Sequence, residues 1–159
     1  MRVVEDEVQT ENGKNLTYGV VQKKPFALVV PWDGTSFTLV RQYRYALDAV
    51  TLEFPQGHYE HDSLEETARA ELREETGLRA GKIKEIGRMY IAPGFCSQEC
   101  FIFLATDVTQ GEPEREEGEE GMEAIAVDYK KFQHMVEEGL ITDAPTIAAW
   151  ALLRAKNLF

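Results

Sequence analysis

A helix that stops at a glycine is predicted for residues 71–78, Glu71-Leu72-Arg73-Glu74-Glu75-Thr76-Gly77-Leu78. At about 100° per residue, Glu74 projects roughly 60° to one side of Glu71, and Glu75 roughly 40° to the other. The three carboxylates therefore share one strip of helix surface, where each pair repels by a few tenths of a kcal/mol. A divalent cation held by oxygen ligands would reverse that repulsion. This strip is the strongest candidate for a functional site.

The helix that carries the strip is predicted to run from residue 64 to residue 76. Ser63 can cap its first turn, and Glu66, three residues later, completes a capping box. Gly77 supplies the left-handed stop at its C-terminus. Four-residue spacing of apolar side chains indicates the buried face, Leu64, Ala68 and Leu72.

The residues before this helix are predicted to form β structure, with strands at 3–8, 16–22, 26–30, 36–40 and 51–54. Asn12-Gly13 and Asp33-Gly34 are strong turn signals, so two hairpins are expected. The strand at 51–54 is predicted to end at Pro55-Gln56-Gly57.

The residues after the helix alternate between strands and helices. Strands are predicted at 83–91, 100–105 and 124–127, and helices at 129–138 and 144–158. Asp143 can cap the last helix, with Pro145 in its first turn. Residues 111–123, which are acidic and contain glycine and proline, are predicted to form a loop. The order of these strands and helices along the chain predicts one α/β domain over residues 1–159, with a mixed sheet covered by helices on both sides.

Charge and hydropathy exclude several classes of partner. The net charge is −11, and residues 112–123, with seven glutamates and one arginine, contribute −6 of it, leaving −5 for the rest. Without a basic stripe, nucleic acid is not an expected partner. No apolar run approaches the ~20 residues of a membrane helix, and the acidic N-terminus does not resemble a signal peptide. A cytoplasmic protein without membrane contact is expected.

The cysteines and histidines do not indicate a metal site. Cys96 and Cys100 are too few for a disulfide framework and lack the second ligand pair of a zinc site. They are expected to be reduced and packed beside a strand. His58, His61 and His134 do not form a metal-binding spacing, and the first two are expected to be exposed loop residues.

Residues 55–78 resemble the Nudix box, a pattern of Gly, five residues, Glu, seven residues, then Arg-Glu-hydrophobic-x-Glu-Glu-x-Gly-hydrophobic. From Glu71 to Leu78 the match is complete. Two departures precede it. In the loop, Gly57 lies one residue later than the first glycine of the pattern, and Asp62 occupies the position of the first Glu. In the helix, Ala70 occupies the position of the family arginine. Arg69 cannot substitute for it, because one helical step turns the side chain by about 100°.

Other segments are similar to the ADP-ribose and nucleoside-diphosphate-sugar pyrophosphatase branch of that family. They include the loop Ala92-Pro93-Gly94-Phe95, with Glu99 after it, and Pro93 follows Gly77 by 16 residues (93 − 77). The remaining matches are Arg41-Gln42-Tyr43-Arg44-Tyr45, Leu52-Glu53-Phe54-Pro55-Gln56-Gly57 and residues 136–144.

The resemblance implies a Nudix α/β/α sandwich with an N-terminal hairpin, and roles for individual residues. Mg²⁺ or Mn²⁺ would be held by the strip carboxylates and the main-chain oxygen of Gln56, that is by Gln56, Glu71, Glu74 and Glu75. Glu53 would support the metal site and Arg44 the diphosphate, although a buried hydrogen-bonded carboxylate and a surface ion pair are the alternatives. Glu120 aligns with the catalytic base, with Glu119 and Glu117 as rivals.

The implied reaction is metal-dependent hydrolysis of the diphosphate of a nucleoside diphosphate sugar such as ADP-ribose, giving AMP and ribose 5-phosphate. Two alternatives stay open. One is a Nudix hydrolase of nucleoside triphosphates or capped RNA. The other is a domain that senses nucleotides without hydrolysing them, to which the missing arginine at Ala70 gives some weight, although the three glutamates favour catalysis. The branch also implies a homodimer, formed through the hairpin at residues 3–22.

Overall fold

The computed structural model describes residues 1–58, 62–115 and 121–158. Its strands are β1 (Arg2–Gln9), β2 (Asn15–Gln22), β3 (Phe26–Pro31), β4 (Ser36–Arg44), β5 (Ala49–Glu53), β6 (Gln56–His58), β7 (Leu78–Tyr90), β8 (Glu99–Gln110) and β9 (Glu123–Asp128). Its helices are α1 (Leu64–Thr76), α2 (Tyr129–Glu137), α3 (Ala144–Ala155) and the short 3₁₀ turn η1 (Tyr45–Leu47).

The central sheet has the strand order β6-β3-β8-β7. It is mixed, because β3 and β8 run parallel, with Leu28 opposite Ile102, whereas β6 and β7 run antiparallel to their neighbours. Alternate residues of a strand face opposite sides. Leu28 accordingly packs into one apolar cluster with α2 and α3, and Val29 into another with α1. Helices therefore cover both faces of this sheet.

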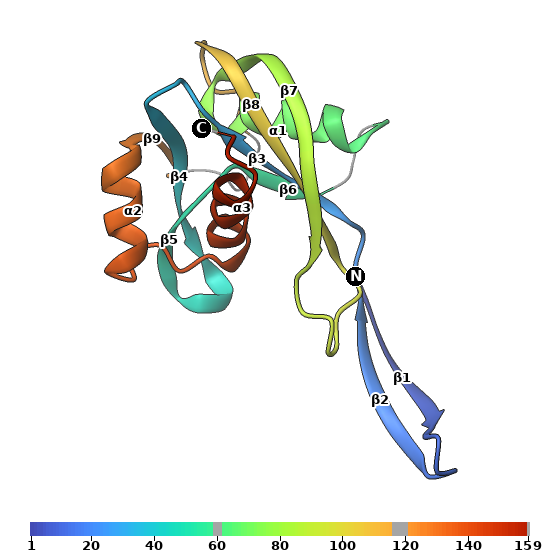
Figure 1. The fold of residues 1–159 in the computed structure, drawn as a ribbon. Helices are drawn as coiled ribbons and strands as arrows, with labels where there is room; N and C mark the ends of the chain where they lie inside the picture. Colours follow the sequence, from blue (N-terminus) through green and yellow to red (C-terminus); the bar gives the residue numbers. More distant parts are fainter. Residues whose placement is uncertain (59–61, 116–120, 159) are drawn as a thin grey trace.

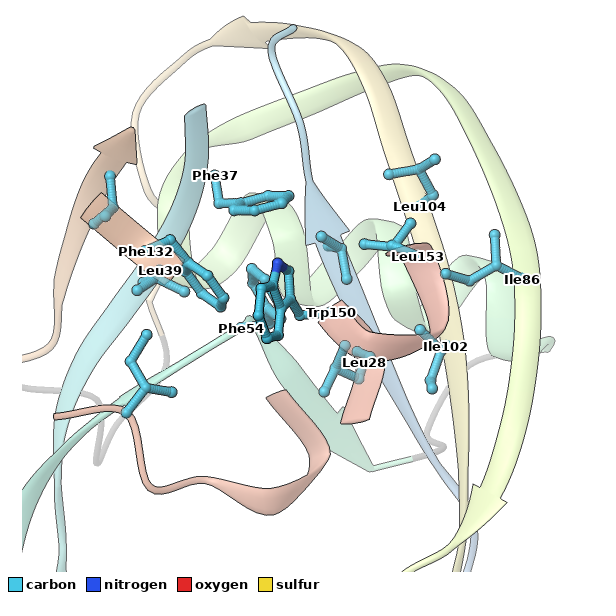
Figure 2. Packing of buried hydrophobic residues seen from close by; sticks show 14 of the residues in the cluster. Leu28, Phe37, Leu39, Phe54, Ile86, Ile102, Leu104, Phe132, Trp150 and Leu153 are labelled. Atoms are coloured by element: carbon cyan, nitrogen blue, oxygen red, sulfur yellow. The ribbon is translucent and has the colours of Figure 1, made fainter. Parts of the chain in front are cut away.

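The second sheet, β5-β4-β9, is antiparallel and packs its apolar side against α2 and α3. Four aromatic rings turn towards one another in this layer (Figure 2), those of Phe37, Phe54, Phe132 and Trp150. The centroids of Phe37 and Phe132 are 5.0 Å apart, and Phe54 stacks on Phe132 at 5.5 Å. The burial of these large rings contributes strongly to the stability of this layer.

Helix α1 has the bounds that the sequence predicts. Ser63 Oγ accepts a hydrogen bond from the Glu66 N–H, and Gly77 adopts a left-handed conformation with φ of 76°. Ala68 and Leu72 are fully buried against the central sheet. The predicted class, an α/β fold with a mixed sheet between helices and an N-terminal hairpin, is confirmed.

One prediction made for the strands was wrong, and one strand was not predicted. The Asp33-Gly34 turn exists, with Asp33 Oδ1 accepting from Thr35 N and Ser36 N at 2.8 Å, but β3 and β4 belong to different sheets. Both edges of β3 are already occupied, by β6 and by β8. The strand before Pro55 ends as predicted, with β5 stopping at Glu53, but Gln56–His58 then forms β6 against β3, a strand that was not predicted.

The N-terminal hairpin β1–β2 is present as predicted and extends away from the rest of the molecule (Figure 1). Its base is hydrogen-bonded to the loop that contains Pro93, with Val21 N donating to Phe95 O at 2.7 Å and Ser97 N to Val21 O at 3.0 Å. No helix within the described residues has the length and apolar character needed to cross a membrane.

Candidate active site

A pocket of about 450 Å³ opens where β5, β6 and the N-terminus of α3 meet. Its walls carry both charged and neutral polar groups, among them Arg44, Glu53, Gln56, His58 and Asp143. The segment Gln56–Gly57 contributes to this pocket and also lies against α1. The pocket and the acidic strip are therefore neighbours that share one short stretch of chain.

Three side chains donate hydrogen bonds to the carboxylate of Glu53. Its side chain is only 3% exposed, and it forms a two-pronged pair with Arg44, whose Nε donates to Oε1 at 2.9 Å. Thr51 Oγ1 also donates to Oε1, and Gln56 Nε2 to Oε2 at 2.6 Å. Burial by itself would raise the pKa of Glu53, but these hydrogen bonds and the charge of Arg44 outweigh it and hold the pKa below its ordinary value. Glu53 is thus a buried, ionised carboxylate at the pocket wall.

Two carboxylates of α1 face the main chain of β6. Gln56 N donates to Glu75 Oε2 at 3.2 Å, and Glu75 is 3% exposed. Glu71 lies so close to Gly57 that a methyl group on the Gly57 Cα would sit 1.7 Å from Glu71 Oε1. The absence of a side chain at Gly57 leaves the space that the Glu71 carboxylate occupies. The shortened loop before the helix therefore still delivers a glycine to the strip.

The donors at this place suit a hard divalent cation. Across the ranges 1–58, 62–115 and 121–158, no three His, Cys, Asp or Glu side chains are gathered closely enough to enclose a metal by themselves. Mg²⁺ seldom needs such a cage, since it commonly takes one or two carboxylates, retained waters and substrate phosphates. Glu71 and Glu75 beside the Gln56 main chain form an all-oxygen set of that kind.

The third carboxylate, Glu74, has different surroundings. Arg73 Nη2 donates to Glu74 Oε1 at 3.2 Å, and Arg73 Nε lies 3.0 Å from Glu114 Oε2. Ala70, at the position of the family arginine, is 5% exposed. Arg69 pairs with Glu65 at 3.0 Å, on another face of the helix, as the sequence indicates.

Asp143 is a pocket residue whose position the sequence did not reveal. It caps α3, accepting from Thr146 N at 2.9 Å, and its Oδ2 lies 3.5 Å from Gln56 Nε2. Burial raises the pKa of Asp143, and the negative charge of Glu53 adds to the effect. The Asp-x-Pro pattern predicts a cap, but no local pattern could place this cap beside Gln56.

Several residues singled out in the sequence lie elsewhere. The predicted base Glu120, and its rivals Glu117 and Glu119, fall outside the described residues, as does His61. The loop Ala92–Phe95 packs on the hairpin, where Tyr18 donates to Gly94 O, and Glu99 forms an ion pair with Arg88 at 3.5 Å. His58 is exposed at the pocket rim, and His134 lies 3.9 Å from Glu137 on α2. Cys96 and Cys100 are free thiols.

Comparison with known proteins identifies the family of the chain. The family model described as the NUDIX domain matches residues 23–150. An ADP-ribose pyrophosphatase of Bacillus subtilis (strain 168) is 33% identical over 156 residues, which are 96% of this chain and 84% of that protein. A GDP-mannose pyrophosphatase of Enterobacter sp. (strain 638) is 22% identical over 99% of this chain and 97% of its own length.

A solved structure agrees with the fold. The crystal structure of an ADP compounds hydrolase has a TM-score of 0.87 to this chain at 22% identity, covering 96% of this chain and 84% of that one. The family and the pyrophosphatase branch that the sequence resembles are thereby confirmed. The chain belongs to the Nudix hydrolase family and is a pyrophosphatase, an enzyme that hydrolyses phosphorus-containing acid anhydrides.

Proposed function

We propose that this chain hydrolyses the diphosphate linkage of a nucleoside diphosphate sugar, with ADP-ribose as the first candidate, and that it needs a divalent metal such as Mg²⁺ or Mn²⁺. The products from ADP-ribose are AMP and ribose 5-phosphate. The observation that carries the proposal is the position of Gln56–Gly57, which borders the pocket on one side and the carboxylates of Glu71 and Glu75 on the other. A sugar nucleotide in the pocket would thereby bring its diphosphate to the acidic strip.

The proposed roles of the residues rest on the family resemblance and, for the described residues, on their surroundings. The bound metal would be held by Glu71, Glu75, Glu74 and the Gln56 main-chain oxygen, and it would neutralise the diphosphate and lower the pKa of an attacking water. Arg44 contributes positive charge at the pocket wall, and Glu53 fixes the orientation of its guanidinium. A glutamate of the acidic loop, Glu120 by alignment, would take the proton of the water.

The relatives leave the nucleotide open between two purines. One named relative is an ADP-ribose pyrophosphatase and the other a GDP-mannose pyrophosphatase. The higher sequence identity of the first, 33% against 22%, favours ADP-ribose. The missing arginine at Ala70 suggests a non-hydrolysing sensor, but the Nudix family match and the pyrophosphatase relatives favour an enzyme.

The experiment is a panel of substrates with product analysis by chromatography. ADP-ribose, GDP-mannose, a nucleoside triphosphate and capped RNA are each incubated with Mg²⁺, Mn²⁺ or EDTA. The proposal expects a nucleoside monophosphate and a sugar phosphate from ADP-ribose, and no product in EDTA. Preferred cleavage of the triphosphate or of capped RNA would contradict it, as would a panel without any turnover.

A matched pair of variants ties the activity to the strip. Glu75→Gln keeps an oxygen that can accept from Gln56 N but removes the charge, so turnover should fall by about 100-fold or more. Glu65→Gln removes a carboxylate from another face of the same helix, where it pairs with Arg69. That variant should retain wild-type turnover. Full activity of Glu75→Gln would remove this residue from the metal site.

We also propose a cytoplasmic homodimer that contacts neither nucleic acid nor membrane. The hairpin β1–β2 supports the dimer, because it projects from the body and exposes Val3, Leu16 and Tyr18. Light scattering at micromolar concentration should give twice the mass of the 18.0 kDa chain. A monomer would contradict this arrangement.

A further inference from the structure

The last turn of α1 joins the acidic strip to the segment that follows β8. Arg73 lies at the centre of this contact, because it donates to Glu74 Oε1 at 3.2 Å and approaches Glu114 Oε2 to 3.0 Å. Arg79 on β7 pairs with the other oxygen of Glu114 at 3.1 Å. Among the described residues Arg73 Nε has no hydrogen-bond partner, so its approach to Glu114 is a charge contact. The four side chains form a chain of alternating charge that ends at the predicted metal ligand.

Hydrogen bonds to the C-terminus of α1 hold the residues that precede Glu114. Gly111 N donates to Gly77 O at 2.9 Å, and Gln110 Nε2 donates to Thr76 O at 3.1 Å. A methyl group on Gly77 would lie 2.4 Å from Gly111 O and 2.9 Å from Pro113 N. The glycine that ends the helix thus also lets the segment with Glu114 lie against it.

Arg73 occupies a position from which it can take over the role of the missing arginine. It follows Ala70 by three residues, which places it about 60° around the helix and roughly 4.5 Å along the axis. Neighbouring residues on a helix do not normally face each other, so the Arg73–Glu74 contact needs a further partner to hold the guanidinium. Glu114 is that partner. Arg69, by contrast, pairs with Glu65 at 40% and 52% exposure, and its Nη1 donates to Ala80 O at 3.2 Å.

We propose that Arg73 is a positioning residue, which orients Glu74 for metal binding and is itself fixed by Glu114 and Arg79. The inference rests on the proposed function of the acidic strip. It assigns a role to the variable position of the Nudix box, between the hydrophobic residue Leu72 and the paired glutamates. It also explains how the strip stays ordered although Ala70 supplies no guanidinium.

The test measures Mn²⁺ binding to the full chain without substrate, by electron paramagnetic resonance of the free ion. Loss of partners around metal ligands typically weakens metal binding by about 10- to 100-fold. Arg73→Gln should therefore raise the Mn²⁺ dissociation constant by about 10-fold, and Arg73→Lys should restore part of the affinity. Glu114→Gln, which leaves α1 intact, should weaken binding in the same direction by about threefold. Arg69→Gln, the control on the other face, should bind as the wild type does.

An increase in the Mn²⁺ affinity of Arg73→Gln would have the opposite meaning. If Arg73 instead withheld Glu74 from the metal, Arg73→Gln would bind Mn²⁺ more tightly, and that result would overturn the proposal. Equal losses in Arg73→Gln and Arg69→Gln would also overturn it, since a general effect of helix charge would then suffice. A shift in melting temperature without a change in Mn²⁺ affinity would show a merely structural role.

The double variant adds an independent criterion. Because Arg73 and Glu114 act through one contact, Arg73→Gln with Glu114→Gln should bind Mn²⁺ about as weakly as Arg73→Gln alone. If the double variant instead lost Mn²⁺ affinity by the product of the two single losses, the coupling between Arg73 and Glu114 would be contradicted. Failure of the proposed reaction can be distinguished from failure of the proposed role of Arg73. If the wild type and the variants bind Mn²⁺ as expected but the wild type hydrolyses no substrate of the panel, the reaction is contradicted and the role of Arg73 is supported.

Discussion

The two sides of the acidic strip are held in different ways. On the pocket side, Glu71 and Glu75 lie against the main chain of β6, beside the buried Glu53. On the other side, Glu74 is held by the side chain of Arg73, which depends in turn on the half-exposed Glu114. Main-chain contacts are fixed by the fold, whereas ion pairs between long side chains are weakened by solvent and salt. The pocket side should therefore be rigid and the other side adjustable.

The strongest way to break the pocket side is Gly57→Ala. The added methyl group would fall 1.7 Å from Glu71 Oε1, so either the carboxylate or β6 must move. Because a displacement of about 1 Å in a catalytic group can cost 10²-fold, turnover of ADP-ribose should fall by about 100-fold. Steady-state kinetics measures this loss.

The control is Gly19→Ala on β2, where an added methyl group meets nothing within 4 Å. Its turnover should equal that of the wild type. If Gly57→Ala were equally active, Glu71 would not depend on the main chain of β6.

Glu53→Gln tests the buried network behind the pocket. It removes the charge that accepts from Arg44, Thr51 and Gln56, and should lower the free energy of unfolding by about 2–3 kcal/mol at pH 7. Urea denaturation followed by circular dichroism provides the measurement. An unchanged midpoint would mean that Arg44 and Glu53 do not hold each other.

The same variant predicts a pH dependence. The folded pKa of Glu53 is lowered from 4.5, so its contribution to stability is present above the unfolded value and is lost as the pH falls through the folded value. Glu53→Gln should therefore lose less stability than the wild type between pH 6 and pH 3. Asp143, whose pKa is raised chiefly by burial, has the opposite sign; it is present in both proteins, and only the part of its shift that comes from the charge of Glu53 is lost in the variant.

Glu114→Gln examines the adjustable side by the same stability assay. Glu114 is 52% exposed and pairs with Arg73 and Arg79, so its loss should cost less than about 1 kcal/mol. The difference from the wild type should shrink further in 1 M NaCl, because salt screens exposed charges. A salt-independent loss as large as that of Glu53→Gln would erase the contrast between the two sides.

The smallest effect concerns the thiol behind the pocket. Burial, followed by the charge of Asp143, raises the pKa of Cys100 to about 12, so that only about 10⁻⁴ of it is thiolate at pH 8. Iodoacetamide at pH 8 should leave Cys100 unmodified in the native protein and alkylate it after denaturation, as peptide mass spectrometry would show. Rapid native alkylation of Cys100 would mean that this side is open to solvent.

Local signals accounted for the parts of the molecule that are locally determined. Ser63 and Gly77 define both ends of α1 through hydrogen bonds and backbone conformation within a few residues of each end, and both were predictable. The spacing of Glu71, Glu74 and Glu75 follows from the helix repeat alone. The N-terminal hairpin was likewise predictable from Asn12-Gly13.

The errors arose where distant segments compete for the same partner. Asp33-Gly34 indicates a turn correctly, but whether β3 pairs with β4 depends on β8, which lies about 70 residues further along the chain. Gln56–His58 became a strand because β3 offered a free edge. Two further contacts join residues that are far apart in the sequence, so no local pattern encodes them: Arg73 with Glu114, and Asp143 with Gln56.

Mn²⁺ bound to crystals of the wild-type protein, located by anomalous scattering, tests most directly whether the acidic strip and β6 together form the metal site. The strongest peak should lie among the carboxylates of Glu71 and Glu75 and the main-chain oxygen of Gln56, and it should be absent from crystals of Glu75→Gln. A peak at Glu53 and Asp143 on the far wall of the pocket, with none on α1, would contradict the account.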